Sequence, residues 1–158
     1  MQAADRVMIQ DLVSRYGFFA DYGPDSAWVD LFAPDARWSV AGTGILVQGR
    51  DELLKLVAII REYASGLHHA QSNQVIGLDG DRATGKVALN QFLLRPEQIY
   101  SVGHGWYDDV YIRIKGRWYF EQRTAQLSPD AMQVSTGGKI GEYMMPMLGQ
   151  FAAQFGKG

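Results

Sequence analysis

The chain contains no cysteine and only three histidines among its 158 residues. Without cysteine there is no disulfide framework, no thiolate nucleophile and no thiolate metal site. The HExxH zinc motif, the glycine-rich nucleotide-binding motifs and the GxSxG serine motif are also absent from the sequence. We therefore expect no metal ion and no cofactor, and we expect any chemistry to depend on proton transfer.

Charge of either sign is also scarce, with 15 Lys and Arg against 17 Asp and Glu and a net charge of −2. No basic surface is available for nucleic acid, so we expect no nucleic-acid partner. No apolar run approaches the roughly 20 residues of a membrane helix. The first 12 residues lack the apolar core of a signal peptide. We therefore expect a cytoplasmic protein that makes no contact with a membrane.

The first part of the chain has the residue spacing of amphipathic helices. We predict three helices, namely Ala3–Ala20 ended by Gly23-Pro24, a short helix that starts at Asp25 or Ser26 and stops before Pro34, and a helix with Asp51 as its N-cap that Gly66 ends. Two short strands are predicted at 36–42 and 42–49.

After Gly66 the pattern changes to the two-residue period of strands. We predict four strands, separated by the hairpin signal Asp79-Gly80-Asp81, a break at 95–97 and the turn Lys115-Gly116. The apolar stretch 139–155 is predicted to be a short docking helix interrupted by its proline.

Helices followed by hairpin-connected strands predict an α+β fold with the helices on one face of an antiparallel sheet. A strongly curved sheet wrapped by the long N-terminal helix and two further helices would form a cone-shaped α+β barrel. Its interior would hold the functional site. We expect a single domain over residues 1–158, with its core at about 4–127 and a C-terminal tail at 128–158.

Two of the three histidines, His68 and His69, are adjacent at the start of a predicted strand. Neighbouring side chains of a strand point to opposite faces, so only one of the two can face the interior. His69 shares its face with Gln71 and Asn73, and such a row is costly against a dry core but suits a ligand pocket. The pattern also allows a surface strand with both histidines in solvent.

Asp21 ends the first predicted helix directly after an apolar stretch. A carboxylate at a helix C-terminus opposes the helix dipole, so we expect a cationic or protonatable partner. His69 is the candidate. An aspartate that accepts a hydrogen bond from one ring nitrogen fixes the tautomer and leaves the other nitrogen free to act as a general base.

Several of these features together resemble the SnoaL-like branch of the nuclear transport factor 2-like superfamily, namely Tyr16, Asp21, the stretch His69–Asn73, Gly116-x-Trp118-x-Phe120 and Arg123. That branch includes scytalone dehydratase, bile-acid 7α-dehydratase and hexachlorocyclohexane dehydrochlorinase. The resemblance covers about 4–127 and implies a cystatin-like, cone-shaped fold.

In those lyases an Asp–His pair inside the cone removes a proton from the substrate. The resemblance therefore implies that His69 is the base and that Asp21 orients it. It also implies that Tyr16 hydrogen-bonds the substrate or leaving group. Arg123 is expected to supply positive charge near the leaving group.

We expect substrate contacts from four further residues, Asn90, Phe92, Trp38 and Tyr107. For Asn90 the strand pattern leaves an outward orientation equally open. His104 shares its parity with apolar neighbours and is expected to be a packed or edge histidine. Asp108 and Asp109 are adjacent, so at most one can point inward.

The leading hypothesis is a cofactor-independent lyase, a dehydratase acting on a hydrophobic cyclic or polyketide-like small molecule. An isomerase or cyclase would use the same pocket, and a non-catalytic small-molecule-binding module is the alternative from another class. The apolar strands between Val102 and Leu127 offer area for an interface. We expect a homo-oligomer, a trimer or a dimer; the resemblance favours the trimer.

Overall fold

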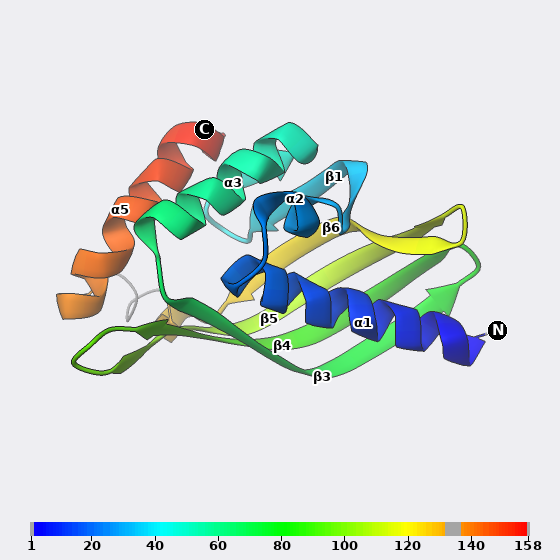
Figure 1. The fold of residues 1–158 in the computed structure, drawn as a ribbon, viewed down its shortest axis with the longest axis horizontal. Helices are drawn as coiled ribbons and strands as arrows, with labels where there is room; N and C mark the ends of the chain where they lie inside the picture. Colours follow the sequence, from blue (N-terminus) through cyan, green and yellow to red (C-terminus); the bar gives the residue numbers. More distant parts are fainter. Residues whose placement is uncertain (1, 132–136, 158) are drawn as a thin grey trace.

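The chain forms a curved six-stranded sheet with its long helices gathered on one side (Figure 1). This computed structural model describes residues 2–131 and 137–157. The elements are α1 (Gln2–Asp21), α2 (Asp25–Val29), β1 (Phe32–Val40), β2 (Ile45–Gln48), α3 (Arg50–Tyr63), β3 (Leu67–Asp79), β4 (Arg82–Leu94), β5 (Ile99–Ile114), β6 (Arg117–Leu127) and α5 (Gly138–Phe155). The predicted α+β class with a curved sheet is confirmed.

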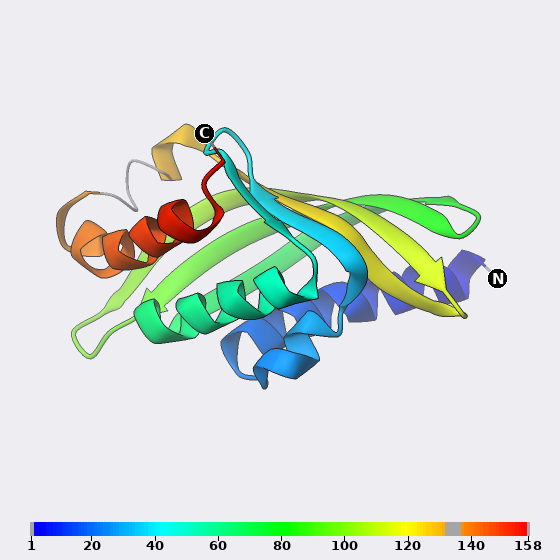
Figure 2. The same ribbon diagram turned by 90° about the horizontal axis from the view of Figure 1, so that it is seen from above.

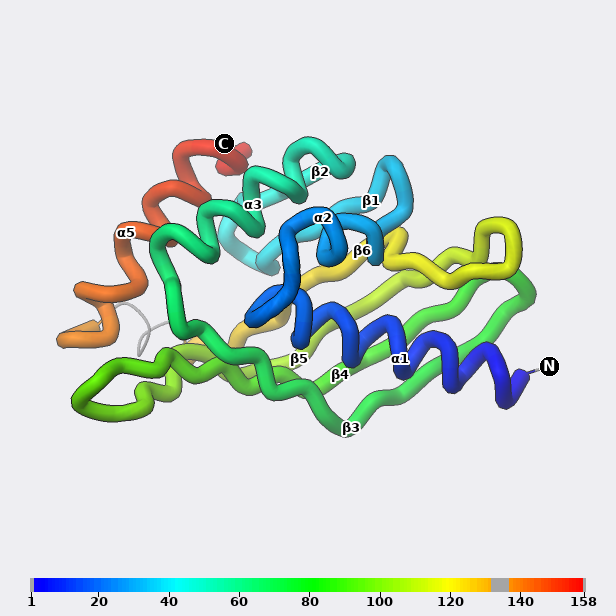
Figure 3. The backbone as a smooth tube through the Cα atoms, viewed as in Figure 1, coloured from blue at the N-terminus to red at the C-terminus, as the bar shows by residue number. Residues whose placement is uncertain are grey.

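The long helix α1 lies along β3, as the backbone trace shows (Figure 3). Its buried residues Ile9, Leu12, Val13 and Tyr16 recur every three or four positions and form the stripe that faces the sheet. The Gln71 side chain of β3 donates a hydrogen bond to the Val13 carbonyl and ties the strand to the helix. This contact holds the C-terminal end of α1 over the start of β3.

Two predicted helix boundaries are wrong. Helix α2 ends at Val29, and β1 then begins at Phe32 and includes Pro34. The strand tolerates this proline because its register against β6 shifts between Phe32 and Arg37. Helix α3 begins at Arg50, so Asp51 is not its N-cap. Gly49 occupies the cap position with a φ of 81° and offers no side chain.

The sheet order is β2-β1-β6-β5-β4-β3. Every neighbouring pair is antiparallel except β1 and β6, which run parallel, so the expectation of a wholly antiparallel sheet is wrong at that pair. The predicted turns are present, and Lys115 and Gly116 connect β5 to β6 with φ values of 50° and 81°. The parallel pairing places β1 beside the last strand and brings Trp38 into the interior.

The prediction of a short helix interrupted by proline is wrong for α5. The helix has 18 residues and continues through Pro146. It lies beside α3 in both ribbon views (Figure 2). Its buried residues include Met144, Met147 and Phe151, and the Phe151 ring packs edge-on against Trp38. The tail is therefore part of the wall around the interior.

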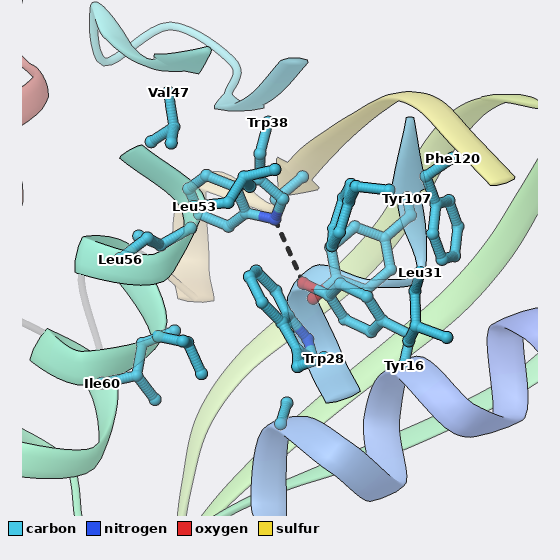
Figure 4. Close-up of a cluster of buried hydrophobic side chains, with 14 of the residues drawn as sticks. Tyr16, Trp28, Leu31, Trp38, Val47, Leu53, Leu56, Ile60, Tyr107 and Phe120 are labelled. Atoms are coloured by element: carbon cyan, nitrogen blue, oxygen red, sulfur yellow. Dashed lines mark hydrogen bonds between the residues drawn. The ribbon is translucent and has the colours of Figure 1, made fainter. Parts of the chain in front are cut away.

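An aromatic cluster fills the space beneath α1 and α2 (Figure 4). Trp28 and Tyr16 pack at a ring-centroid distance of 5.4 Å, and both rings also contact Phe32.

Within the described ranges, no helix is both long and apolar enough to cross a membrane.

Candidate active site

Asp21 and His69 form a closely paired dyad. The Asp21 Oδ1 atom lies 2.7 Å from His69 Nδ1, and Oδ2 accepts the His69 backbone N–H at 2.8 Å. Both side chains are buried, with 2% and 4% of their surfaces exposed. One carboxylate thus holds both the backbone and the ring of the same histidine. Because a carboxylate can only accept, His69 Nδ1 carries the proton and donates it to Asp21, and Nε2 carries the lone pair.

The Nε2 side of His69 faces an apolar cavity of about 400 Å³ between the sheet, α3 and α5. Its walls include Trp38, Ile45, Ile60, Leu67, Leu89, Val102, Tyr107, Leu127, Met144, Met147, Leu148 and Phe151. Among residues 2–131 and 137–157, none that forms the walls is aspartate, glutamate, lysine or arginine. This cavity is the interior that the cone-shaped fold predicts.

Tyr16 lines the same cavity beside His69, with 6.2 Å between the two ring centroids. The Trp38 Nε1–H donates a hydrogen bond of 3.1 Å to the Tyr16 hydroxyl (Figure 4), and the Tyr107 ring packs edge-on against the Tyr16 ring. Burial raises the pKa of Tyr16 above its ordinary value, although the Arg123 guanidinium opposes this shift. The Tyr16 hydroxyl therefore stays protonated at neutral pH and can donate a hydrogen bond into the cavity.

Arg123 lies behind the cavity wall and does not line it. Its guanidinium is completely buried and forms two hydrogen bonds to Asp109, of 2.8 and 2.7 Å. It also stacks on Tyr16 and Tyr107, at about 4 Å from each ring centroid. Because these two rings separate it from the cavity, the expected position beside a leaving group is wrong. Arg123 therefore packs against the Tyr16 ring without lining the cavity.

Two of the four predicted substrate contacts are also misplaced. Trp38 and Tyr107 line the cavity, whereas Asn90 is exposed and Phe92 lies outside the cavity walls. Along β4 the inward positions are the buried Leu89 and its second neighbour Gln91.

Gln91 is the site residue that the sequence pattern missed. Its side-chain amide lies 2.9 Å from His69 Nε2, inside the cavity. With Nδ1–H donated to Asp21, this Nε2 accepts a hydrogen bond from the amide N–H. The only available signal was the parity of β4, which places Gln91 opposite His69 in the register with β3.

His68 does not simply point away from the dyad. Its ring is 40% exposed on the other side of β3, yet its Nδ1 lies 3.2 Å from Asp21 Oδ2 and 3.1 Å from the Tyr22 hydroxyl. Asp21 ends α1 directly over this strand, so its carboxylate meets both neighbouring histidines.

The third histidine and the acidic pair play other roles. His104 is exposed on β5, which lies between β6 and β4, and its Nε2 hydrogen-bonds the Ser128 hydroxyl, so it is neither packed nor on an edge strand. Of the adjacent acids only Asp109 is buried. Across residues 2–131 and 137–157, no three histidine or acidic side chains cluster as metal ligands would.

With this geometry defined, comparison with protein families identifies the chain. The model of the SnoaL-like domain matches residues 1–124. The chain belongs to the SnoaL-like domain family. The match stops before α5, so the helix that closes the cavity lies outside the matched region. No curated protein matches the chain by sequence.

Solved structures share the SnoaL-like fold at low sequence identity. An Asp-to-Asn variant of Rv3472, a protein of unknown function from Mycobacterium tuberculosis, superposes with a TM-score of 0.87 at 21% identity, over 99% of this chain and 93% of its own. A candidate scytalone dehydratase from Novosphingobium aromaticivorans gives 0.71 at 21%, over 80% and 86%. The hexachlorocyclohexane dehydrochlorinase LinA Type2 gives 0.71 at 21%, over 80% and 87%. Other similar structures have the cystatin-like fold, which confirms the predicted fold class.

Proposed function

We propose that this SnoaL-like protein is a cofactor-independent lyase, a dehydratase of a neutral hydrophobic cyclic or polyketide-like molecule. The observation that carries the proposal is the His69 ring, whose Nδ1 is held by a buried carboxylate and whose Nε2 meets the Gln91 amide at the wall of an apolar cavity. When Asp21 fixes the proton on Nδ1, Nε2 can accept a proton, and this is the arrangement that a histidine general base requires. Two structural neighbours named as a candidate dehydratase and a dehydrochlorinase support the reaction class.

In the proposed reaction, His69 Nε2 removes a proton from a carbon next to an activating carbonyl group. The electron pair of that C–H bond forms the new C=C bond, and the C–O bond to the hydroxyl breaks. The proton then passes from His69 to the departing oxygen, which leaves as water. No proton is consumed overall, and the Asp21 carboxylate stabilises the imidazolium between the two transfers.

The Tyr16 hydroxyl is the proposed donor to the substrate carbonyl as negative charge develops on its oxygen. Trp38 donates to the Tyr16 oxygen, which directs the Tyr16 proton toward other acceptors in the cavity. A preorganised donor in a site without bulk water stabilises such a charge strongly. Gln91 donates to His69 Nε2, and the substrate would displace this amide.

The cavity walls define the class of substrate. Because no aspartate, glutamate, lysine or arginine of the described part of the chain lines the cavity, a carboxylate or phosphate on the substrate would be buried without a counterion from those residues. The polar groups gather around His69, Tyr16 and Gln91, while the methionines of α5 form an adaptable apolar wall. The substrate is therefore expected to be uncharged, with its reactive carbonyl and hydroxyl at one end.

An isomerase would use the same residues, because it also begins with proton removal next to a carbonyl group. The two reactions differ in the fate of the proton, which returns to carbon in an isomerisation and to oxygen in a dehydration. Nothing about His69, Asp21 or Tyr16 distinguishes these outcomes, so product analysis must do so. A binding module without catalysis would not require the base itself.

The test is a panel of neutral cyclic β-hydroxyketones incubated with the protein in the presence of a metal chelator. Dehydration gives a conjugated enone, which is followed by its ultraviolet absorbance. We expect turnover with at least one member of the panel, and a loss of at least about 100-fold in kcat for His69→Ala. An Asn90→Ala variant is the matched control and should keep its activity. Equal rates in wild type and His69→Ala would contradict the proposal.

A further inference from the structure

A second, polar cavity of about 440 Å³ lies on the other side of the dyad, between α1 and β3. Its walls include Gln10, Ser14, Phe18, Asp21, Tyr22, His68, Gln71, Ser72, Asn73 and Gln74. His69 is the residue that contributes to both cavities. The dyad therefore stands in the wall between an apolar interior and a polar groove, with its carboxylate on the groove side.

His68 occupies this groove within reach of the dyad carboxylate. Its Nδ1 is 3.2 Å from Asp21 Oδ2, a distance at which a protonated imidazole forms an ion pair. The Tyr22 hydroxyl lies 3.1 Å from the same nitrogen, and the two rings pack with their centroids 6.0 Å apart. The position of His68 is therefore fixed by two residues at the end of α1.

One carboxylate thus faces two imidazoles. The titratable groups that contact His68 are Asp21, the last residue of α1, and Tyr22, which follows the helix. Its register partner on β4 is the uncharged Phe92. His69 is faced by the same Asp21, by Tyr16 and by the uncharged Gln91. The single negative charge of Asp21 can neutralise one imidazolium, so the two histidines must compete for it.

Burial decides which histidine should carry the first proton. A cation on the half-exposed His68 keeps most of its hydration, whereas a cation on His69 is removed from water. Once His68 is charged, it offsets the Asp21 carboxylate and repels a second proton on His69. In that state His69 remains neutral, as a general base must be.

We propose that His68 is a positioning residue of the site, which shares Asp21 with His69 and keeps His69 unprotonated as the pH falls. The proposal rests on the proposed role of His69 as the base. It follows that, as the pH falls, His69 becomes protonated at a different pH in wild type than in a variant without His68. His68 acts through Asp21 and does not reach the substrate cavity.

The test is a pH titration of the imidazole ¹⁵N and ¹H signals of the ¹⁵N-labelled protein, in which only three histidines must be assigned. In His68→Gln, His69 should take up its proton at a higher pH, by a factor of about three or more in the proton affinity. In His68→Lys, which places a fixed cation beside Asp21, the change should have the opposite sign. His104→Gln is the control and should leave the His69 curve unchanged.

A curve for His69 that is the same in wild type, His68→Gln and His68→Lys overturns the proposal. Opposite shifts in two folded variants cannot result from a loss of structure, which the amide spectrum monitors. A coupled titration together with full activity of His69→Ala would overturn the proposed function alone. If wild type lacks the hydrogen-bonded Nδ1 proton of His69, both proposals fail.

Discussion

Replacement of Arg123 by methionine should destabilise this fold strongly. The Arg123 guanidinium is completely buried, and its partner Asp109 is also buried. In Arg123→Met, the Asp109 carboxylate would retain only the hydrogen bond from the Tyr111 hydroxyl, and the Gln71 side-chain oxygen would lose its donor. Removing one partner of a buried ion pair costs about 3–5 kcal/mol because the remaining charge is uncompensated.

Urea unfolding monitored by tryptophan fluorescence measures this cost as the free energy of unfolding. For a chain of this length, 3–5 kcal/mol lowers Tm by about 6–20 °C. The matched control is Arg82→Met, which breaks an exposed ion pair with Glu121 and should cost less than about 1 kcal/mol. The double variant Arg123→Met with Asp109→Leu should recover part of the loss, because no buried charge then lacks a partner.

The reasoning fails if Arg123→Met is no less stable than Arg82→Met. It also fails if the double variant loses the sum of the two single losses, since the buried charges would then be independent. Either result would contradict the claim that the buried Arg123–Asp109 pair stabilises the fold as a coupled unit.

Two further predictions concern alkaline stability and the cavity lining. Burial raises the pKa of Tyr16, Tyr107 and Tyr111, so above pH about 10 the unfolded chain loses tyrosine protons that the folded protein keeps. The contribution of these tyrosines to the free energy of unfolding is constant below that pH and should then fall by about 1.4 kcal/mol per pH unit for each tyrosine. Urea titrations at pH 9–11 check this, and an unchanged slope in Tyr111→Phe would argue against it. Gln91→Ala should raise kcat/KM about 2- to 12-fold, because the substrate no longer has to displace the amide from His69 Nε2, while Asn90→Ala should leave it unchanged. Equal values for the two variants in the kinetic assay would contradict this role of Gln91.

The elements of the fold are largely predictable because their signals are local. The Asp-Gly and Lys-Gly turns mark the hairpins, and the spacing of Ile9, Leu12, Val13 and Tyr16 marks the long helix. The parallel pairing of β1 with β6 has no local signal, because the two strands are far apart in the sequence. The sequence also does not predict that α5 continues through Pro146, because a proline inside a helix normally ends or kinks it.

The sequence predicts a site residue where its type is unusual for its position in a helix or strand. It misses a site residue where only the alternation of a strand indicates which side chains face the interior. A carboxylate at a helix C-terminus, such as Asp21, is unfavourable without a hydrogen-bonding or cationic partner, and in the structure this partner is His69. On β4 the run around Asn90 and Gln91 has no clean alternation, and an error of one residue exchanges the two faces. Arg123 was recognised but misplaced, because its pairing with Asp109 depends on the register of two strands. The homo-oligomer stays a prediction.

The central claim is that His69 acts as a base inside the apolar cavity. The most direct measurement is the exchange of α-hydrogens of 2-tetralone, a neutral bicyclic ketone, for deuterium in D₂O, followed by NMR after saturation-transfer spectra have shown that the ketone binds. This exchange requires only proton removal and return, so it is independent of the natural substrate. We predict that wild type exchanges these hydrogens about 10²–10⁴-fold faster than His69→Ala. Equal exchange rates with the ketone bound to both proteins would contradict the claim.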